Sequence, residues 1–231
     1  MRDIESNLER WRQSLCPKIE VGGLISRSSV AHKWKAPHRS IVLRELLFWR
    51  LHDLLVQVVA LAKGNHGLGA RILLRSAVET LALLIFLNQK TEAVLSKKEP
   101  FSAFNEATSK LLLGSKDKST SWEAVNILNV LEKCKQHHPG LVQLHVILCE
   151  CTHPNYDGVA GGYSRVDHEN FTTLFENSWA TRWGAEQEKA IRLCMAAFES
   201  EYNDVWPELF GRLEVWLVEN DAELEASKNG R

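Results

Sequence analysis

The chain has 231 residues, of which 45% are hydrophobic and 25% are charged, enough for one large domain with a substantial core. Its formal net charge of −1 creates no overall field that would recruit nucleic acid or an anionic membrane, so any contact with nucleic acid has to be local. The start lacks a secretory pattern, and the longest apolar run, Leu81 to Leu87, is too short to span a bilayer. We therefore expect a cytoplasmic protein without a membrane partner and with reduced cysteines.

Hydrophobic residues recur at helical spacing from the first residues onward. A short amphipathic helix over residues 3–15 is stopped by Pro17, and residues 22–40 form a basic, loop-like connection. The first long helix, Ile41 to Ala62, has a broad apolar face. Gly64-Asn65 ends it, and a second long helix follows directly as an antiparallel partner.

Further helices follow the two long ones, and we find no strand-like alternation of useful length. Pro139 suits the first turn of one of them, Pro154 ends that helix, and a Gly-rich loop follows. The expected helices are 101–113, 122–135 with Ser121 as its N-cap, 141–152, 185–203 and 208–226.

The pattern as a whole predicts an all-α, single-domain helical bundle of about seven to eight helices. Residues 1–40 form an N-terminal helix and basic loop, and residues 41–203 form the bundle core. Residues 204–231 form a C-terminal amphipathic helix and tail.

The second long helix, His66 to Gln89, is apolar on nearly every side, which is typical of a central helix. Arg71, Arg75 and Glu79 follow one another at four-residue intervals and share one stripe of it. A buried Arg or Glu costs on the order of several kcal/mol unless it is paired or lines a cleft. Arg75 and Glu79 are therefore either an ion pair that holds helices together or part of a site.

The second informative segment is His145 to Asn155. His145, Cys149 and His153 stack on one face of its helix. His153 falls at the helix C-terminus, where the helix dipole favours a charged imidazolium. A role as a simple helix cap stays open for His153, and His145 and Cys149 also suit core positions.

These features resemble the HEPN-like all-α superfamily, in particular its prokaryotic branch with a helical Arg-x-x-x-Glu and a later His-Pro-Asn. The motifs here are Arg75 with Glu79, and the His-Pro-Asn that begins at His153, about 75 residues later. The resemblance covers roughly residues 41–203. It implies a helical bundle, a homodimer, and a metal-independent endoribonuclease or toxin or antiphage effector that acts on RNA with no cofactor.

The resemblance also implies roles for single residues. Arg75 would hold the scissile phosphate, His153 would be the general acid or base, and Glu79 would orient Arg75 or His153. Asn155, Arg71 and His145 are the candidate substrate-binding residues. The chemistry is coherent in itself, because cleavage by the 2′-hydroxyl needs a base, an acid and a cation for the phosphorane charge.

Two alternatives remain open. The chain has no compact Arg-to-His motif of the kind that active HEPN nucleases carry, which favours a non-catalytic regulatory or adaptor module that binds a protein or nucleotide partner. A zinc site is the other alternative, because Cys and His residues cluster between Cys134 and His153. Cys149 and Cys151 point about 200° apart on a helix, so we expect no metal.

Overall fold

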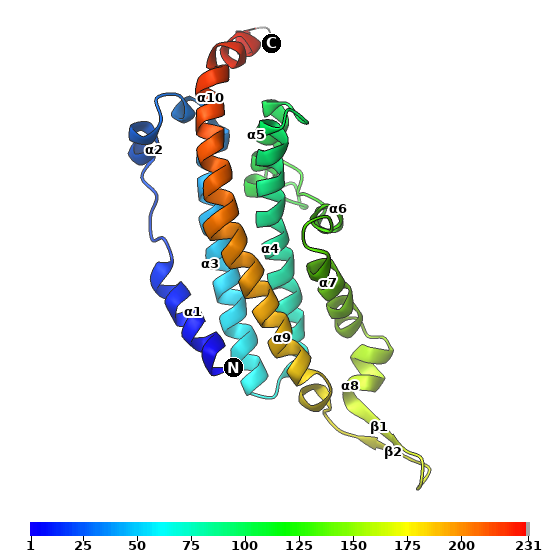
Figure 1. Ribbon diagram of the computed structural model, residues 1–231. Helices are drawn as coiled ribbons and strands as arrows, with labels where there is room; N and C mark the ends of the chain where they lie inside the picture. Colours follow the sequence, from blue (N-terminus) through cyan, green and yellow to red (C-terminus); the bar gives the residue numbers. More distant parts are fainter. Residues whose placement is uncertain (230–231) are drawn as a thin grey trace. The chain divides into compact units, whose positions relative to one another are not determined.

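The computed structural model describes residues 1–229, which are mainly helical and contain one short hairpin (Figure 1). This confirms the predicted all-α helical bundle. The α-helices are α1 (Arg2–Ser14), α2 (Val21–Arg27), α3 (Lys35–Lys63), α4 (Gly67–Leu95), α5 (Phe101–Leu113), α6 (Ile127–Cys134), α7 (Pro139–Thr152), α8 (Gly161–Tyr163), α9 (Trp179–Ser200) and α10 (Trp206–Asn229). A 3-10 turn η1 (Ala31–Lys33), two π turns η2 (Tyr156–Ala160) and η3 (Glu201–Val205), and strands β1 (Ser164–Asp167) and β2 (Thr172–Phe175) complete the list.

The chain divides into two compact units. Unit 1 comprises Met1–Leu15, Phe48–Ala82 and Leu131–Ala197, and unit 2 comprises Cys16–Leu47, Leu83–Val130 and the chain from Phe198 onward. The divisions fall within α3, α4, α6 and α9, and after α1. The boundaries expected from the sequence, after residues 40 and 203, stay a prediction. No helix in residues 1–229 has the length and apolar character needed to cross a membrane.

The core of unit 1 is built on α4, as its apolar circumference predicts. Leu74, Ala77, Val78 and Leu81 of α4 are 0% exposed. The amphipathic α1 adds the side chains of Ile4, Leu8 and Trp11, all buried. Trp11 lies edge-on to Phe48 of α3, with ring centroids 5.5 Å apart.

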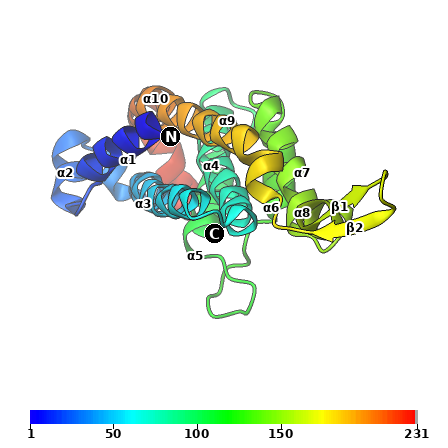
Figure 2. The same cartoon turned by 90° about the horizontal axis from the view of Figure 1, so that it is seen from below.

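Unit 1 also holds the hairpin of β1 and β2, which extends beyond α8 (Figure 2). The strands are antiparallel, with Ser164 opposite Phe175 and Asp167 opposite Thr172. The sequence pattern does not predict this hairpin. Each strand has only four residues, and β2 is exposed along its whole length, so no alternation of apolar and polar residues marks it in the sequence.

Unit 2 contains a polar cluster that we call the Tyr202 cluster: Arg44, Glu45, Asn88, Glu201 and Tyr202. The Tyr202 hydroxyl donates to the Glu45 carboxylate at 2.9 Å, and Arg44 Nη1 donates to Glu45 Oε1 at 2.6 Å. The Arg44 guanidinium lies over the Tyr202 ring, 3.5 Å from its centroid. Asn88 Nδ2 donates to Glu201 Oε2 at 2.7 Å. Burial raises the pKa of the Tyr202 phenol well above its ordinary range.

The π turn η3 makes α9 and α10 one continuous helical stretch, where we expected two helices, 185–203 and 208–226. Pro207 has no N–H and cannot continue the α-helical bonding pattern of the preceding residues. The chain accommodates it by widening the turn, with the Trp206 N–H bonded to the Glu201 carbonyl. The proline therefore changes the turn before it without ending the helix. The expected C-terminal tail is helical as far as Asn229, and its last two residues lie outside the described residues.

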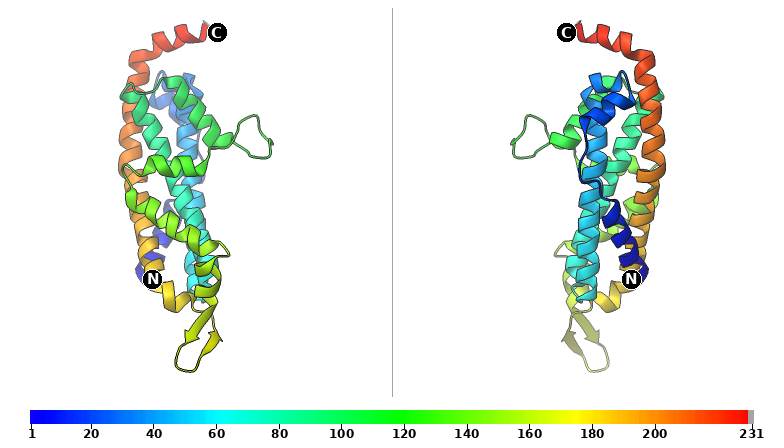
Figure 3. Two further views of the ribbon diagram at one scale, coloured as in Figure 1. Left: turned by 90° about the vertical axis from the view of Figure 1, so that its right-hand side faces the viewer. Right: turned by 90° about the vertical axis from the view of Figure 1, so that its left-hand side faces the viewer.

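Three helix starts differ from the prediction by five or six residues. α9 begins at Trp179 and not at residue 185, and the other two differences have local causes. α3 begins at Lys35 because Pro37 suits a first turn, and the basic connection before it contains α2 and η1. α6 begins at Ile127, where the Asn126 side chain accepts the Leu128 N–H at 2.9 Å, so Asn126 and not Ser121 is the cap. Residues 114–126 form the long loop between α5 and α6 (Figure 3).

Candidate functional site

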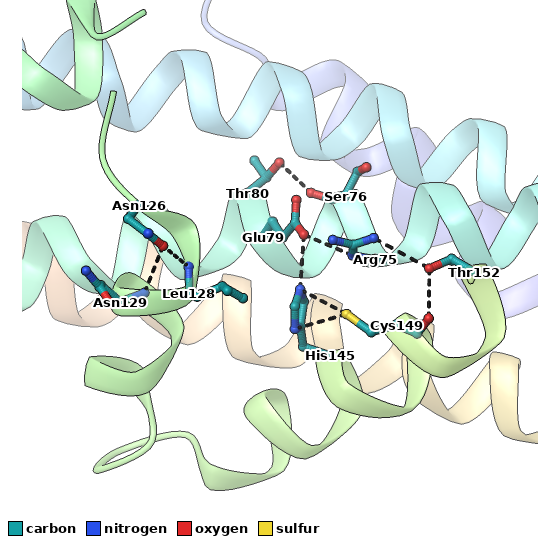
Figure 4. A network of polar contacts seen from close by, with 10 residues as sticks. All are labelled: Arg75, Ser76, Glu79, Thr80, Asn126, Leu128, Asn129, His145, Cys149 and Thr152. Carbon is teal, nitrogen blue, oxygen red and sulfur yellow. Dashed lines mark hydrogen bonds and ion pairs between the residues drawn. The ribbon is translucent and has the colours of Figure 1, made fainter. Parts of the chain in front are cut away.

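The polar stripe of α4 meets α7 within unit 1 (Figure 4). Glu79 Oε1 accepts hydrogen bonds from Arg75 Nε at 3.1 Å and from His145 Nε2 at 3.0 Å. We call this group, with Cys149 and Thr152 of α7, the Glu79 cluster. Arg75 and Glu79 meet because residues four apart lie on the same face of a helix, and α7 adds His145 as a third partner.

Exposure and charge differ among the three central side chains. Arg75 is 33% exposed and Glu79 is 25% exposed, whereas His145 is only 5% exposed. The hydrogen bond from His145, together with the charge of Arg75, holds the pKa of Glu79 below its ordinary value against the opposing effect of burial. Glu79 is therefore ionised at neutral pH. Since an ionised carboxylate only accepts hydrogen bonds, Nε2 of His145 carries the hydrogen in this contact.

Cys149 and Thr152 complete the cluster. Cys149 Sγ lies 3.7 Å from His145 Nδ1, and burial raises the pKa of its thiol. A protonated thiol is a poor nucleophile, so the Cys149–His145 pair does not resemble an activated cysteine. The Thr152 hydroxyl donates to the Cys149 carbonyl at 3.0 Å and accepts a long bond of 3.5 Å from Arg75 Nη1.

His153 does not join this cluster. It is exposed, and in residues 1–229 no hydrogen bond or ion pair connects its imidazole to Arg75 or Glu79. The helix has ended at this position, where φ is −81° and ψ is 148°, so the His153 side chain no longer follows the face that His145 and Cys149 share. The histidine that meets Glu79 is His145, two turns earlier.

Asn155 has local partners. Its Oδ1 accepts the Gly158 N–H at 3.1 Å, and its Nδ2 donates to Glu150 Oε2 at 2.7 Å. This places it as the N-cap of η2. Gly158 has to be a glycine, because a Cβ there would lie 2.0 Å from the His153 carbonyl oxygen.

Arg71 lies one turn before Arg75 and is almost fully buried, with 2% of its surface exposed. Its guanidinium carbon is 5.6 Å from the centre of the Trp183 ring, over which Arg182 also lies. Arg71 forms no ion pair with any residue in 1–229, and its buried Nε has no hydrogen-bond partner there. A buried guanidinium that faces an aromatic ring and has no carboxylate partner is unusual.

The sequence pattern indicates Arg75 and Glu79 but not Thr152, and it favours His153 over His145 as the reacting histidine. The signal was present, because His145, Cys149 and Thr152 are spaced by four and three residues and so share one face of a helix.

Within residues 1–229, no group of three or more His, Cys, Asp or Glu side chains is arranged to hold a metal ion. The chain gives no significant match to a protein-family model, to a curated protein or to a solved structure. Its function has to be inferred from its own residues.

Proposed function

We propose that the Glu79 cluster is the reaction site of a HEPN-like protein that binds and cleaves RNA without a metal ion. The observation that supports this best is the joining of Arg75 and Glu79, both partly exposed, to a histidine 66 residues beyond Glu79 in the chain. A permanent cation, an ionised carboxylate and an imidazole are the groups that metal-independent phosphodiester cleavage requires.

Arg75 is the proposed phosphate ligand. Its hydrogen bonds to described residues use Nε and Nη1. The guanidinium has five N–H donors in a planar fork, so the edge that includes Nη2 is left for two phosphate oxygens. Glu79 fixes the orientation of this fork from behind, as the resemblance implies.

Glu79 is also the proposed general base. As an ionised carboxylate it can take the proton of the RNA 2′-hydroxyl as the 2′-oxygen attacks phosphorus, while His145 holds it in place. The bond from phosphorus to the 5′-oxygen then breaks, and this leaving oxygen needs a proton. We assign that proton to the exposed His153 of a second copy in a homodimer.

The test is cleavage of single-stranded RNA by purified protein in the presence of a chelator. Arg75→Ala and Glu79→Gln should each lower the rate at least about 100-fold, the size expected when a positioned general base or phosphate ligand is lost. Arg212→Ala is the matched control, because Arg212 forms an exposed ion pair with Glu208 at the same four-residue spacing. A parent protein that leaves RNA intact, or variants as active as the parent, would refute the proposal.

A second candidate function is a non-catalytic adaptor that binds a protein partner. It is favoured by the hairpin, where Phe171 is 94% exposed and Phe175 is 86% exposed. Light scattering on the parent and on a Phe171→Ser, Phe175→Ser variant tests the one partner that needs no identification, a second copy. A dimer that the parent forms and the variant loses, together with RNA left intact by the dimeric parent, would favour the adaptor.

A further inference from the structure

Unit 2 contains a cavity of about 1150 Å³ that is separate from the Glu79 cluster in sequence and in lining. Three segments form it: the start of α3 with the residues before it, the end of α4 with the start of α5, and the second half of α10.

The lining is strongly basic. Among the side chains that the structure describes, five Lys and Arg residues line the cavity against two glutamates. One of the glutamates, Glu99, is neutralised by Lys90 at 2.7 Å, and one of the cations, Lys33, is matched by Asp221 at 2.5 Å.

The other four cations have no carboxylate partner in the described part of the chain. Arg39 donates only to the neutral amide of Asn105, at 3.2 Å. Lys35, Lys97 and Lys98 are exposed and form no ion pair with residues 1–229. The second glutamate, Glu223, forms no ion pair with residues 1–229 and supplies one negative charge against these four cations. The remaining excess of positive charge favours a ligand with more than one negative charge.

Aromatic rings form another part of the wall. Phe101 stacks on Trp216, with centroids 5.8 Å apart and ring planes at 27°, and Trp34 meets Phe101 edge-on at 5.5 Å. Trp34 and Trp216 are both partly exposed. Indole faces of this kind bind planar ring systems by stacking, with little dependence on the identity of the ring.

Lys97 occupies a position where glycine is the favoured residue. It follows the end of α4 with a φ of 58°, in the left-handed region. A side chain there is strained, whereas glycine is not. The chain therefore carries a lysine at the rim of the cavity in place of the residue that would stabilise the turn.

We infer that this cavity binds a phosphorylated ligand with a planar ring, the chemistry of a nucleotide. The phosphates would contact Lys35, Lys97 and Lys98, and the ring would stack on the aromatic wall. The volume slightly exceeds the range of roughly 300–1,000 Å³ that is common for small-molecule sites, so a nucleotide fits with its hydration. This goes beyond the proposed function, because no residue of the Glu79 cluster lines the cavity.

Titration calorimetry of the purified full chain tests the inference with three probes: ATP, adenosine and inorganic phosphate. ATP should bind in a saturable way that weakens as salt is added, and each of the other two probes should bind at least 10-fold more weakly, because each lacks half of the recognised chemistry. If none of the probes binds to the parent protein, the inference is wrong.

Variants locate the binding. Lys97→Gly with Lys98→Gln should weaken ATP binding at least 10-fold while Lys97→Gly alone raises the melting temperature, so weaker binding cannot be attributed to unfolding. Trp216→Leu should weaken ATP more than it weakens inorganic phosphate. Lys110→Gln is the control, because Lys110 is a lysine of α5 that pairs with Glu106 and does not line the cavity. Equal affinity of the parent and the Lys97–Lys98 variant would overturn the inference.

Two further measurements define the ligand. Tighter binding of a 5′-phosphorylated single-stranded RNA than of ATP would assign the cavity to an RNA end, and the reverse would assign it to a free nucleotide; both support nucleotide recognition. Arg75→Ala should bind ATP like the parent even if it no longer cleaves RNA, so the cavity and the proposed reaction site can fail separately.

Discussion

The Glu79 cluster of unit 1 and the Tyr202 cluster of unit 2 are built from similar parts. Each combines an arginine and a glutamate from one helix with a polar side chain from a segment far along the chain, His145 in one case and Tyr202 in the other. They differ in exposure, because the Glu45 side chain is 10% exposed and the Glu79 side chain is 25% exposed.

The surroundings of the two arginines differ as well. Arg44 is covered by the Tyr202 and Trp206 rings, donates to the Tyr202 carbonyl, and is 19% exposed. Arg75 is 33% exposed, and one of its two bonds to described residues is long. An ion pair enclosed by rings and hydrogen bonds holds helices together, whereas a pair with an open guanidinium edge can also bind a ligand.

The largest expected loss of stability comes from a substitution in the Tyr202 cluster. Glu45→Gln should lower the free energy of unfolding by about 3 kcal/mol, because it leaves the mostly buried Arg44 without its counter-ion. Urea denaturation at neutral pH measures it. Glu9→Gln, which removes an exposed partner of Arg12, should give no measurable change. If both variants lose the same stability, burial of the Arg44–Glu45 ion pair does not make it stronger than an exposed one.

A smaller effect is expected from Glu79→Gln, about 1–2 kcal/mol at neutral pH, because Glu79 accepts two hydrogen bonds but is partly solvated. The effect should depend on pH. The pKa of Glu79 is lower in the folded protein than its ordinary 4.5, so its contribution is complete above that pH and is lost as the pH falls through the folded-state pKa. The free energies of unfolding of the parent and the variant, measured from pH 7 to pH 3, should therefore converge as the pH falls. A constant difference would contradict the role of an ionised Glu79.

The smallest effect is expected from Arg71→Met, within about 0.5 kcal/mol of the parent. The variant loses a contact with the Trp183 face but no longer buries an uncompensated charge, and these two terms oppose each other. Thermal and urea unfolding measure the difference. A loss of about 3 kcal/mol would mean that the Arg71 charge is compensated in solution, which would make its environment resemble that of Arg44.

The sequence was sufficient to identify α4 as a central helix and to single out Arg75 and Glu79, because both conclusions depend only on spacing along one helix. It also placed His145, Cys149 and His153 on one face. It did not determine which of these residues meets Glu79, since that depends on how α7 is rotated against α4 and on where α7 ends. The structure resolves this in favour of His145.

The Tyr202 cluster was not predicted at all. Arg44 and Glu45 are neighbours in the sequence and fit the polar side of an amphipathic helix, which is the pattern of a solvated face. Tyr202 lies 157 residues after Glu45, in a turn whose π geometry differs from that of the flanking helices. A pairing of this kind depends on tertiary packing, which local periodicity does not report. The four-residue strands of the hairpin were not predicted, because strands without a buried face need no alternation of apolar and polar residues.

The π turn at Glu201–Val205 also sets the direction in which each side chain of α10 points around the helix axis. A π turn holds one residue more than the α-helical turn that it replaces, so it acts as a single-residue insertion. Deleting one residue there would rotate every later side chain by about 100° around the helix axis. Phe210, Leu213 and Leu217, which are buried in unit 2, would then leave its core. This part of the chain should therefore tolerate substitutions more readily than changes in length.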